Sequence, residues 1–470
     1  MHTFKTAGIT WFLEDPSLER VVERLGHEPK EKRAHFIWEH DRGKVFIKFF
    51  QEKGLPGLIR NRILPRGKKE YELSERLRSL SILTPKALGY GVARRGSYVI
   101  QEWIEGEPLI AWKYDSVKRP KIVSVIIPLL EKLRATGLRH NDLHLGNIVE
   151  ASGQLYLVDL HKGSLKKRFT FADDVSNVSH ALAMLHDGMD EREKAWFFNR
   201  YGGDALRGSV EQELARLKQR WITRKAARAF RTTSVLVASR SRVTVRGMEE
   251  KTRGEYLVAI KKDLKVMVER YTDHVRKTYA SRRRLHRAWK NHVILEYMRF
   301  FIAPRPYCLQ QASVSARGYI AMEDLTGKGE ELDRFLDRNY DGMSRAERDG
   351  LIDGLSSFLV SAFIKGITHR DLKACNVFVL RRGAFLLLDV EDLEFSGLDD
   401  AAIKRMLIQL NTTVPGRVSI PDRLRFFTKV TRPRLSASER KRLLKEIASE
   451  SLGREIVYEG VHGLKREAWK

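Results

Sequence analysis

The chain has 470 residues, and 87 Lys and Arg against 60 Asp and Glu give it a formal net charge of +27. With 42% hydrophobic and 9% aromatic residues it can bury a core in each of about two to four domains, which excludes wholesale disorder. Two cysteines are too few for a disulfide framework, and the longest apolar stretch, residues 122–130, is about half a membrane span. We therefore expect a protein of the reducing cytoplasm, soluble or bound to a membrane surface.

Matching segments recur in the same order along the chain. Two pairs, separated by 221 and 229 residues, are YVIQEWIEG (98–106) with YIAMEDLTG (319–327) and HNDLHLGNIVE (140–150) with HRDLKACNVFV (369–379). Self-similarity of this kind indicates a duplicated structural unit. The midpoint of the chain lies in a basic stretch without acidic residues, 216–246. The sequence therefore predicts two domains, residues 1–235 and 236–470.

Each half begins with strand-like residues and continues with helical ones. In the first half KVFIKFF (44–50) is rich in Val, Ile and Phe, as half-buried strands are, and the segment 67–80 places apolar residues at helical spacing. In the second half the strand-like residues lie in 255–271, and the helical segment is 282–298. A further strand and a longer helical region then precede the H-x-D segment. This order predicts an α+β fold in which each domain has a small β-rich lobe before a helical lobe.

The pattern H-x-D-L-x-x-x-N, followed by an apolar strand that ends in Asp, occurs twice. Phosphoryl transfer needs a carboxylate beside the attacking hydroxyl and oxygen ligands that hold Mg²⁺ against the phosphates. An Asp and an Asn five residues apart on a tight loop, facing an Asp at the end of the next strand, meet this need. The residues are His140, Asp142, Asn147 and Asp159 in the first half, and His369, Asp371, Asn376 and Asp389 in the second.

These motifs resemble those of the lipopolysaccharide kinase family, whose members phosphorylate Kdo or heptose sugars of the lipopolysaccharide inner core. The resemblance covers about residues 35–175 and 255–410. It implies two tandem protein-kinase-like domains and an ATP- and Mg²⁺-dependent kinase that acts on a sugar hydroxyl of a core glycolipid. The enzyme would be a peripheral protein at the cytoplasmic face of the inner membrane of a Gram-negative bacterium.

The resemblance also implies roles for single residues. In the first domain Asp142 would be the catalytic base, and Asn147 and Asp159 would be magnesium ligands. The residues implied for ATP binding there are Lys48 for the phosphates, Glu70 as its helix partner, Glu102 and Trp103 at the hinge, and His144 on the loop. The corresponding residues of the second domain are the base Asp371 and the magnesium ligands Asn376 and Asp389.

The first domain departs from the protein-kinase pattern around its loop. Asn141 replaces the usual Arg, so we do not expect regulation by a phosphorylated activation loop. His144, two residues after Asp142, is typical of small-molecule and sugar phosphotransferases, whereas kinases of Ser and Thr have Lys there. No glycine-rich G-x-G-x-x-G loop precedes Lys48. The histidine favours a sugar hydroxyl as the acceptor.

The segment before the second H-x-D motif also departs from the family pattern. In VMVERY, Glu269 falls at the lysine position when residues are counted back from Pro304, and Trp289 falls where the first domain has Glu70. A rival register makes Lys261, in the literal VAIK, the phosphate lysine. The second domain is therefore either a pseudokinase that supports the first or a second kinase. The residues available to replace the lost lysine are Lys261, Lys265 and Lys373, of which Lys373 is placed to reach the γ-phosphate.

The positive charge is concentrated between Arg216 and Arg299. A basic surface attracts nucleic acid or anionic lipid headgroups, but zinc-finger and RNP motifs are absent, so we expect an anionic membrane surface and no specific nucleic acid. Two alternative functions are a protein Ser/Thr kinase and a non-catalytic tandem pseudokinase scaffold that binds anionic membrane or nucleic acid.

His161 belongs to no motif, and we expect it to be an ordinary histidine of the core or surface.

Overall fold

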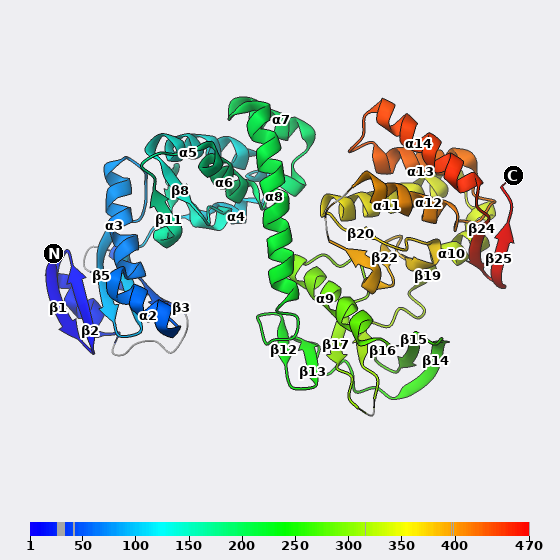
Figure 1. Cartoon of the computed structure of the whole chain (residues 1–470), viewed down its shortest axis with the longest axis horizontal. Helices are drawn as coiled ribbons and strands as arrows, with labels where there is room; N and C mark the ends of the chain where they lie inside the picture. Colours follow the sequence, from blue (N-terminus) through cyan, green and yellow to red (C-terminus); the bar gives the residue numbers. More distant parts are fainter. Residues whose placement is uncertain (26–32, 41–42, 315, 396, 398, 470) are drawn as a thin grey trace. The chain divides into compact units, whose positions relative to one another are not determined.

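The computed structural model describes residues 1–25, 33–40, 43–314, 316–395, 397 and 399–469. The chain divides into two compact units, residues 1–217 and 218–470, and each is described by itself (Figure 1). The division falls inside helix α8 (Gly203–Ala226), because Leu206 packs into the core of unit 1 whereas Ile222 packs into that of unit 2. It therefore lies before the domain boundary that we expected from the repeat.

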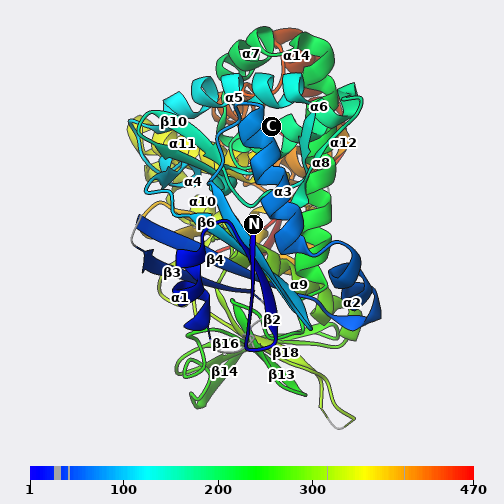
Figure 2. The ribbon, with the colours of Figure 1, turned by 90° about the vertical axis from the view of Figure 1, so that its left-hand side faces the viewer.

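Unit 1 begins with a six-stranded antiparallel sheet in the order β1-β2-β5-β6-β4-β3. The strands are β1 (His2–Thr6), β2 (Ile9–Leu13), β3 (Arg33–His40), β4 (Gly43–Gln51), β5 (Ala87–Ala93) and β6 (Gly96–Glu102). The predicted strand 44–50 is confirmed as β4, whose side chains Ile47 and Phe49 are buried. Helix α3 (Arg66–Ser79), the predicted helical segment, packs against β5 and β6 (Figure 2).

The rest of unit 1 is helical, with short strands that carry the H-x-D loop. The helices are α1 (Glu19–Glu23), α2 (Gly54–Ile63), α4 (Leu109–Trp112), α5 (Ile122–Thr136), α6 (Phe171–Leu182) and α7 (Glu191–Arg200). The strands are β7 (Glu107–Pro108), β8 (Leu138–His140), β9 (Ile148–Ala151), β10 (Gln154–Leu157) and β11 (Gly163–Leu165). Gly137, in the left-handed conformation that glycine adopts freely, ends the apolar helix α5 and leads directly into β8. None of the described helices is long and apolar enough to cross a membrane.

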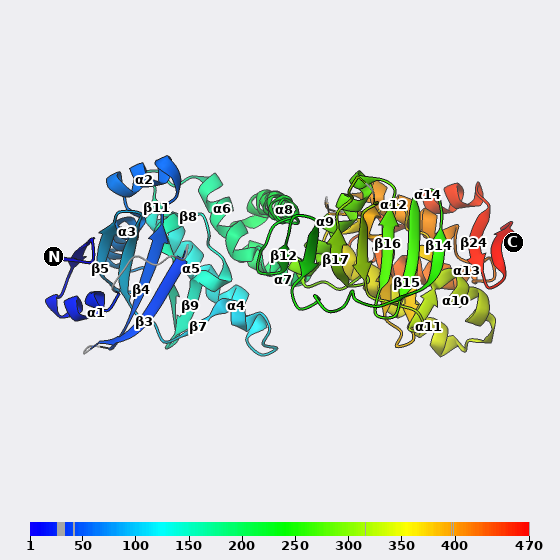
Figure 3. The same ribbon diagram turned by 90° about the horizontal axis from the view of Figure 1, so that it is seen from below.

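Unit 2 begins with a seven-stranded antiparallel sheet in the order β12-β13-β17-β18-β16-β15-β14 (Figure 3). The strands are β12 (Leu236–Ala238), β13 (Arg242–Val245), β14 (Tyr256–Lys262), β15 (Val266–Tyr271), β16 (Val275–Tyr279), β17 (Pro306–Gln310) and β18 (Tyr319–Met322). The region 255–271 therefore contains two paired strands, β14 and β15. Strand β16 lies between β18 and β15, as β4 lies between β6 and β3 in unit 1. The predicted helical segment is confirmed as α9 (Arg282–Met298).

Helices and short strands again follow the sheet in unit 2. The helices are α10 (Leu332–Asn339), α11 (Arg345–Ile364), α12 (Asp400–Asn411), α13 (Ile420–Thr431) and α14 (Ala437–Leu452). The strands are β19 (Gly329–Glu331), β20 (Thr368–His369), β21 (Val377–Leu380), β22 (Phe385–Leu387), β23 (Leu393–Glu394), β24 (Ile456–Gly460) and β25 (Gly463–Glu467). The chain is thus a mixed α and β protein in which sheet residues precede helical residues within each unit.

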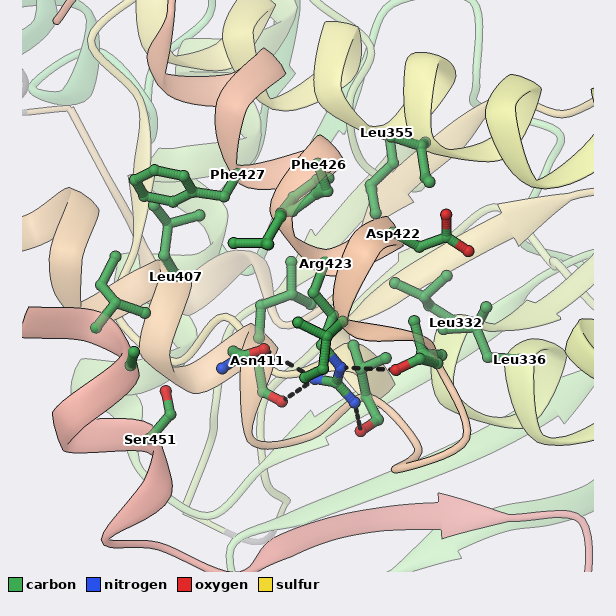
Figure 4. Close-up of a pocket in the computed structure, with 18 of the residues that line it drawn as sticks. Leu332, Leu336, Leu355, Leu407, Asn411, Asp422, Arg423, Phe426, Phe427 and Ser451 are labelled. Carbon is green, nitrogen blue, oxygen red and sulfur yellow. Dashed lines mark hydrogen bonds between the residues drawn. The ribbon is translucent and has the colours of Figure 1, made fainter. Parts of the chain in front are cut away.

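An apolar cavity of about 250 Å³ lies among α10, α11, α12, α13 and α14 of unit 2 (Figure 4). Leu355, Leu407 and Phe427 line it, and Arg423 of α13 closes one side. The Arg423 guanidinium donates hydrogen bonds of 2.7 to 3.1 Å to the carbonyl oxygens of Asn411, Val414, Pro415 and Val418. Burial lowers the pKa of Arg423 to about 10, so the side chain stays charged at neutral pH. Through these hydrogen bonds, the charged Arg423 side chain holds the connection between α12 and α13 against this part of the core.

Candidate active site

The H-x-D loop of unit 1 is held by its own hydrogen bonds. The Asp142 amide donates to Nδ1 of His140 (3.3 Å), and Nε2 of His140 donates to the carbonyl oxygen of Asp159 (3.2 Å). Burial lowers the pKa of His140 to about 4, so its ring is neutral near pH 7 and these bonds determine its tautomer. Asn147 donates from Nδ2 to the carbonyl oxygen of Asp142 (2.9 Å), which keeps its Oδ1 as the remaining acceptor. The loop therefore holds Asp142 and Asn147 in a defined arrangement.

Lys48, Glu70 and Asp159 meet in one ion-pair cluster, although they come from β4, from α3 and from the turn after β10. Lys48 Nζ lies 3.3 Å from Oε2 of Glu70 and also pairs with Asp159. Asp159 has φ 61°, a left-handed conformation that non-glycine residues adopt at a cost. This backbone conformation turns the chain sharply after the strand and leaves the carboxylate beside the lysine.

The cluster offers oxygen ligands that suit a cation. Burial raises the pKa of Glu70, whose side chain is fully buried. Burial also pushes up the pKa of Asp159, but the hydrogen bond from His161 and the charge of Lys48 together hold it far below its usual range. Glu70, Asp159 and His161 each offer one ligand atom, and these atoms lie within 4.8 Å of one another. Because Mg²⁺ prefers oxygen ligands, the partly exposed carboxylate of Asp159 fits that ion better than the imidazole does, whereas Glu70 is fully buried beside Lys48.

His161 is a largely buried histidine with a hydrogen-bond partner, as expected, but the sequence analysis missed that this partner belongs to the site. Its Nδ1 donates to Oδ1 of Asp159 at 2.6 Å and lies 3.8 Å from Oε2 of Glu70. The signal that could have identified it is its position two residues after Asp159. The short turn Leu160–Lys162 that follows the strand folds the imidazole back onto the carboxylate.

Lys162, on the same turn, is a second residue that the sequence analysis missed. Its ammonium group pairs with the carboxylate of Asp142. Burial raises the pKa of Asp142, but the hydrogen bond and charge of Lys162 lower it further, so the pKa lies below its usual value. Asp142 is therefore ionised at neutral pH, as a group that accepts a proton must be.

His144, Glu102 and Trp103 were expected to contact the nucleotide. His144 caps its own turn, because its Nδ1 accepts a hydrogen bond from the Gly146 amide at 3.1 Å. Glu102 is the exposed last residue of β6. The ring of Trp103 lies beside that of Phe46 on β4, with 5.9 Å between centroids. The nucleotide contacts expected of these three residues stay predictions.

The H-x-D loop of unit 2 repeats two of the internal hydrogen bonds of the unit 1 loop. The Asp371 amide donates to Nδ1 of His369 (3.2 Å), and Asn376 donates from Nδ2 to the carbonyl oxygen of Asp371 (2.8 Å). Asp389 is left-handed, with φ 49°. Lys373 Nζ lies 3.1 Å from Oδ2 of Asp371. The expected contact of Lys373 with a γ-phosphate stays a prediction, and in this structure the lysine pairs with the carboxylate of the loop.

Lys277 of β16 holds in unit 2 the position that Lys48 holds in unit 1. It lies opposite Ile320 of β18, as Lys48 lies opposite Val99 of β6. Its Nζ is 2.6 Å from Oδ1 of Asp389. Lys277 and Asp389 therefore form an ion pair in unit 2, as Lys48 and Asp159 do in unit 1.

The expectation that Glu269 or Lys261 occupies this position was therefore wrong. Glu269 lies on the neighbouring strand β15, and Lys261 lies on the edge strand β14, where it is exposed and 3.7 Å from Asp263. Counting back from the proline failed because unit 1 has the ten-residue helix α2 between β4 and α3. In unit 2 the chain passes from β16 to α9 through residues 280–281 alone.

In unit 2 the acid that pairs with the lysine lies on a turn and not on the helix. Oε2 of Glu391 is 3.1 Å from Lys277 Nζ and accepts a hydrogen bond from the Tyr279 hydroxyl at 3.2 Å. Arg284 of α9 pairs with Oε1 of Glu391 at 3.0 Å. Trp289, which was expected at the place of the helix glutamate, is buried in the core. Nothing in the spacing of the sequence indicated that the acid had moved from the helix to the loop.

Comparisons with known proteins do not establish the function of the chain, which therefore has to be inferred from this site. No known family and no curated protein matches the chain. A solved structure described as "WaaP in complex with acyl carrier protein" is similar over 46% of this chain and 98% of that chain, at 20% sequence identity and a TM-score of 0.34. A likeness at this level carries no argument about the activity.

Proposed function

We propose that unit 1 is a kinase that transfers the γ-phosphoryl group of ATP, with Mg²⁺, to a sugar hydroxyl of the lipopolysaccharide inner core, on Kdo or heptose. The observation that carries the proposal is the position of Lys48 between Glu70 and Asp159, with Asp142 and Asn147 on one hydrogen-bonded loop. A lysine for the phosphates, oxygen ligands for the cation and a separate ionised carboxylate are the groups that phosphoryl transfer needs.

Each residue of the site has a distinct part in this reaction. Lys48 would contact the phosphate oxygens, and the buried carboxylate of Glu70 keeps its ammonium group oriented. Asp159 and Asn147 would hold the cation through their oxygen atoms. Bound Mg²⁺ and ATP supply the phosphoryl group and neutralise its charge. Asp142, which is ionised, would orient the acceptor hydroxyl and take its proton.

Charge supports an anionic sugar as the acceptor. The ammonium group of Lys162 lies beside Asp142, where an acceptor hydroxyl would arrive, and it can pair with a phosphate or carboxylate near that hydroxyl. The net charge of +27 suits a substrate held at an anionic membrane surface. The protein would then act as a peripheral enzyme at the cytoplasmic face of the inner membrane.

The test is transfer of labelled γ-phosphate from ATP to dephosphorylated lipopolysaccharide core, with the purified full chain and Mg²⁺. We expect Asp142→Asn and Lys48→Met each to reduce transfer at least about 100-fold, because each removes a group that acts in the transition state. Lys44→Met is the matched control. Lys44 lies on the same strand but is exposed and pairs with Glu105, so transfer should stay at the wild-type level.

Three outcomes would contradict the proposal. Unchanged transfer in Asp142→Asn would exclude this carboxylate as the base. Label that enters a protein substrate when glycolipid is absent would favour a protein Ser/Thr kinase. No transfer to any acceptor, together with salt-sensitive binding to anionic vesicles, would favour the non-catalytic scaffold.

A further inference from the structure

Helix α2 of unit 1 is attached to the sheet through its polar side. Its buried residues are Gly57 and Asn61, one turn apart. The Asn61 side chain donates hydrogen bonds of 2.9 and 3.1 Å to the carbonyl oxygens of Ala93 and Gly96, at the turn between β5 and β6. Gly57 lies against Glu52, because a Cβ atom there would come within 3.3 Å of the carboxylate. The contact of α2 with the sheet is therefore made largely by hydrogen bonds and small side chains.

The apolar side chains of α2 face solvent, at the periphery of unit 1 (Figure 3). Leu55, Ile59 and Ile63 recur every four residues and are 76%, 56% and 77% exposed. Residues at this spacing share one face of a helix, and Ile59, two residues before Asn61, lies on the side opposite to it. Scattered exposed apolar residues are ordinary, but a surface helix of a soluble protein normally turns such a stripe inward. The stripe is therefore available to an apolar partner.

The residues around the stripe are basic. Between positions 53 and 69 the sequence has six Lys or Arg residues and no acidic residue. Arg60 and Arg62 are exposed and lie on either side of the stripe. Arg60 pairs with the buried Glu52, which Arg66 also contacts at 3.1 Å, so two guanidinium groups share one carboxylate. The segment therefore keeps an excess of positive charge beside its apolar side chains.

An apolar stripe bordered by basic residues is complementary to the surface of an anionic bilayer. Apolar side chains of such a helix enter the boundary between headgroups and acyl chains, while Arg and Lys keep their charges at the phosphates. A groove on a protein would also have to match the helix in shape, whereas a bilayer requires only apolar side chains on one side and cations beside them. Unit 2 has no corresponding helix, because residues 280–281 alone join β16 to α9.

We infer that α2 is a membrane-binding helix: Leu55, Ile59 and Ile63 insert among the lipids of an anionic bilayer, and Arg60 and Arg62 contact the phosphates of the headgroups. The inference rests on the proposed function in its choice of a membrane, because the proposed acceptor is a glycolipid. Three side chains are too few to attach the chain alone. Insertion therefore adds to the attraction of the net charge, and high salt still releases the protein.

The connection of α2 to the candidate active site is short. Only Leu64 and Pro65 separate α2 from α3, the helix that carries Glu70. A helix fixed at the lipid surface therefore keeps the start of α3 near that surface, where a glycolipid acceptor would be embedded. The apolar side chains of α2 would then contribute to the position of the enzyme on the membrane as well as to its affinity.

The experiment measures binding of the full chain to vesicles that contain phosphatidylglycerol, at low salt. Ile59→Gln with Ile63→Gln removes most of the stripe without changing the charge, and Gln is a good helix former. We expect this double variant to bind at least about 10-fold more weakly, because two aliphatic side chains no longer enter the lipid. Leu264→Gln with Ile364→Gln is the matched control, since it replaces two exposed aliphatic residues of unit 2 and should bind as the wild type does. Equal binding of the α2 variant and the wild type would overturn the inference.

A second measurement separates insertion from attraction by charge alone. An environment-sensitive fluorophore attached at Ile59→Cys should shift its emission to shorter wavelength when vesicles are added, because it enters the bilayer. The same label at Leu264→Cys should not shift. Cys308 is buried, and wild-type protein treated with the label corrects for any reaction at Cys375. Emission that stays unchanged at Ile59→Cys would show that α2 remains in water, against the inference.

Oligomeric state and transfer distinguish the remaining outcomes. If the wild type is a dimer without vesicles and Ile59→Gln with Ile63→Gln makes it a monomer, a second copy covers the stripe and the inference fails. Transfer of phosphate to deacylated core oligosaccharide needs no membrane. Vesicle binding that depends on the stripe, without transfer to any acceptor, would support the membrane helix and contradict the proposed function. Transfer by a wild type whose vesicle binding does not depend on the stripe would do the reverse.

Discussion

Asp159 and Asp389 show how much a single residue contributes to each cluster. Both have positive φ, 61° and 49°, although neither is glycine. The left-handed conformation costs roughly 1–2 kcal/mol in such a residue. The ion pairs with Lys48 and Lys277 offset this cost, because each brings two partly buried opposite charges together. An apolar residue at either position would keep the strain and lose the compensation.

His292 of α9 is a buried base whose titration should be visible in the stability of unit 2. Burial, with the nearby charge of Lys277, lowers its pKa to about 3. The unfolded chain takes up a proton near pH 6.5 whereas the folded unit does not, so this contribution to stability is present above pH 6.5 and is lost as the pH falls toward 3. We expect His292→Gln to reduce the slope of the unfolding free energy against pH by up to about 1.4 kcal/mol per pH unit.

Denaturant unfolding at several pH values between 5 and 7 would measure this slope. His462→Gln is the control, because His462 lies exposed in the turn between β24 and β25. A slope that is equal in wild type and His292→Gln would show that the imidazole is not kept neutral in the folded protein.

At the scale of elements, the close packing of α3 on β6 determines where Glu70 lies. A Cβ atom at Gly67, in the first turn of α3, would lie 1.9 Å from the carbonyl oxygen of Tyr98. Gly67→Ala must therefore displace the helix. We expect the variant to lose about 1–3 kcal/mol of stability through overpacking and to reduce phosphoryl transfer at least about 10-fold, because the pair between Glu70 and Lys48 is disturbed. Unfolding and transfer assays on the same protein would check both effects.

Gly208→Ala provides the comparison for that prediction. Gly208 lies within helix α8, and a Cβ atom there would meet nothing within 4 Å. Alanine at such a site restricts the unfolded chain, so stability should rise by about 0.4–1 kcal/mol and transfer should not change. Equal losses in both variants would contradict the argument from close packing.

In each unit, the turn that follows Asp159 or Asp389 carries charges opposite to those that face it from the helix packed against it, α3 in unit 1 and α9 in unit 2. In unit 1 the two residues after Leu160 are basic or neutral, His161 and Lys162, and the helix contributes the acid. In unit 2 the equivalent residues are Glu391 and Asp392, and bases from α9 and from the H-x-D loop pair with them. Each combination satisfies the buried charges, because what matters is that opposite charges meet and not which element carries them.

At the scale of the whole molecule, the net charge of +27 predicts electrostatic attachment to anionic membranes. Each basic residue near an anionic surface contributes about 1 kcal/mol, and salt screens this attraction within a Debye length of about 8–10 Å. We expect the full chain to sediment with vesicles that contain phosphatidylglycerol at 50 mM salt and to be released by 500 mM salt. Vesicles of phosphatidylcholine are the control, and binding to them that salt does not reverse would indicate apolar attachment instead.

The amino-acid sequence alone was sufficient for the features that depend on residues close together in the chain. The strand 44–50, the helices 67–80 and 282–298 and both H-x-D loops follow from local periodicity and from a motif of fixed spacing. Lys48 with its helix partner Glu70, and Asp159 as a magnesium ligand, were also expected, though from a family resemblance rather than from spacing.

Only the tertiary structure decided which residues complete the two clusters. Lys277 is identified by the pairing of β16 with β18, and a count along the chain missed it because α2 lengthens the corresponding connection in unit 1. Glu391, His161 and Lys162 lie on turns whose side chains acquire partners only when the sheet and the helix pack over them. The physical reason is that a buried charge is satisfied by whatever opposite charge lies within a few ångströms, and the sequence does not record that distance.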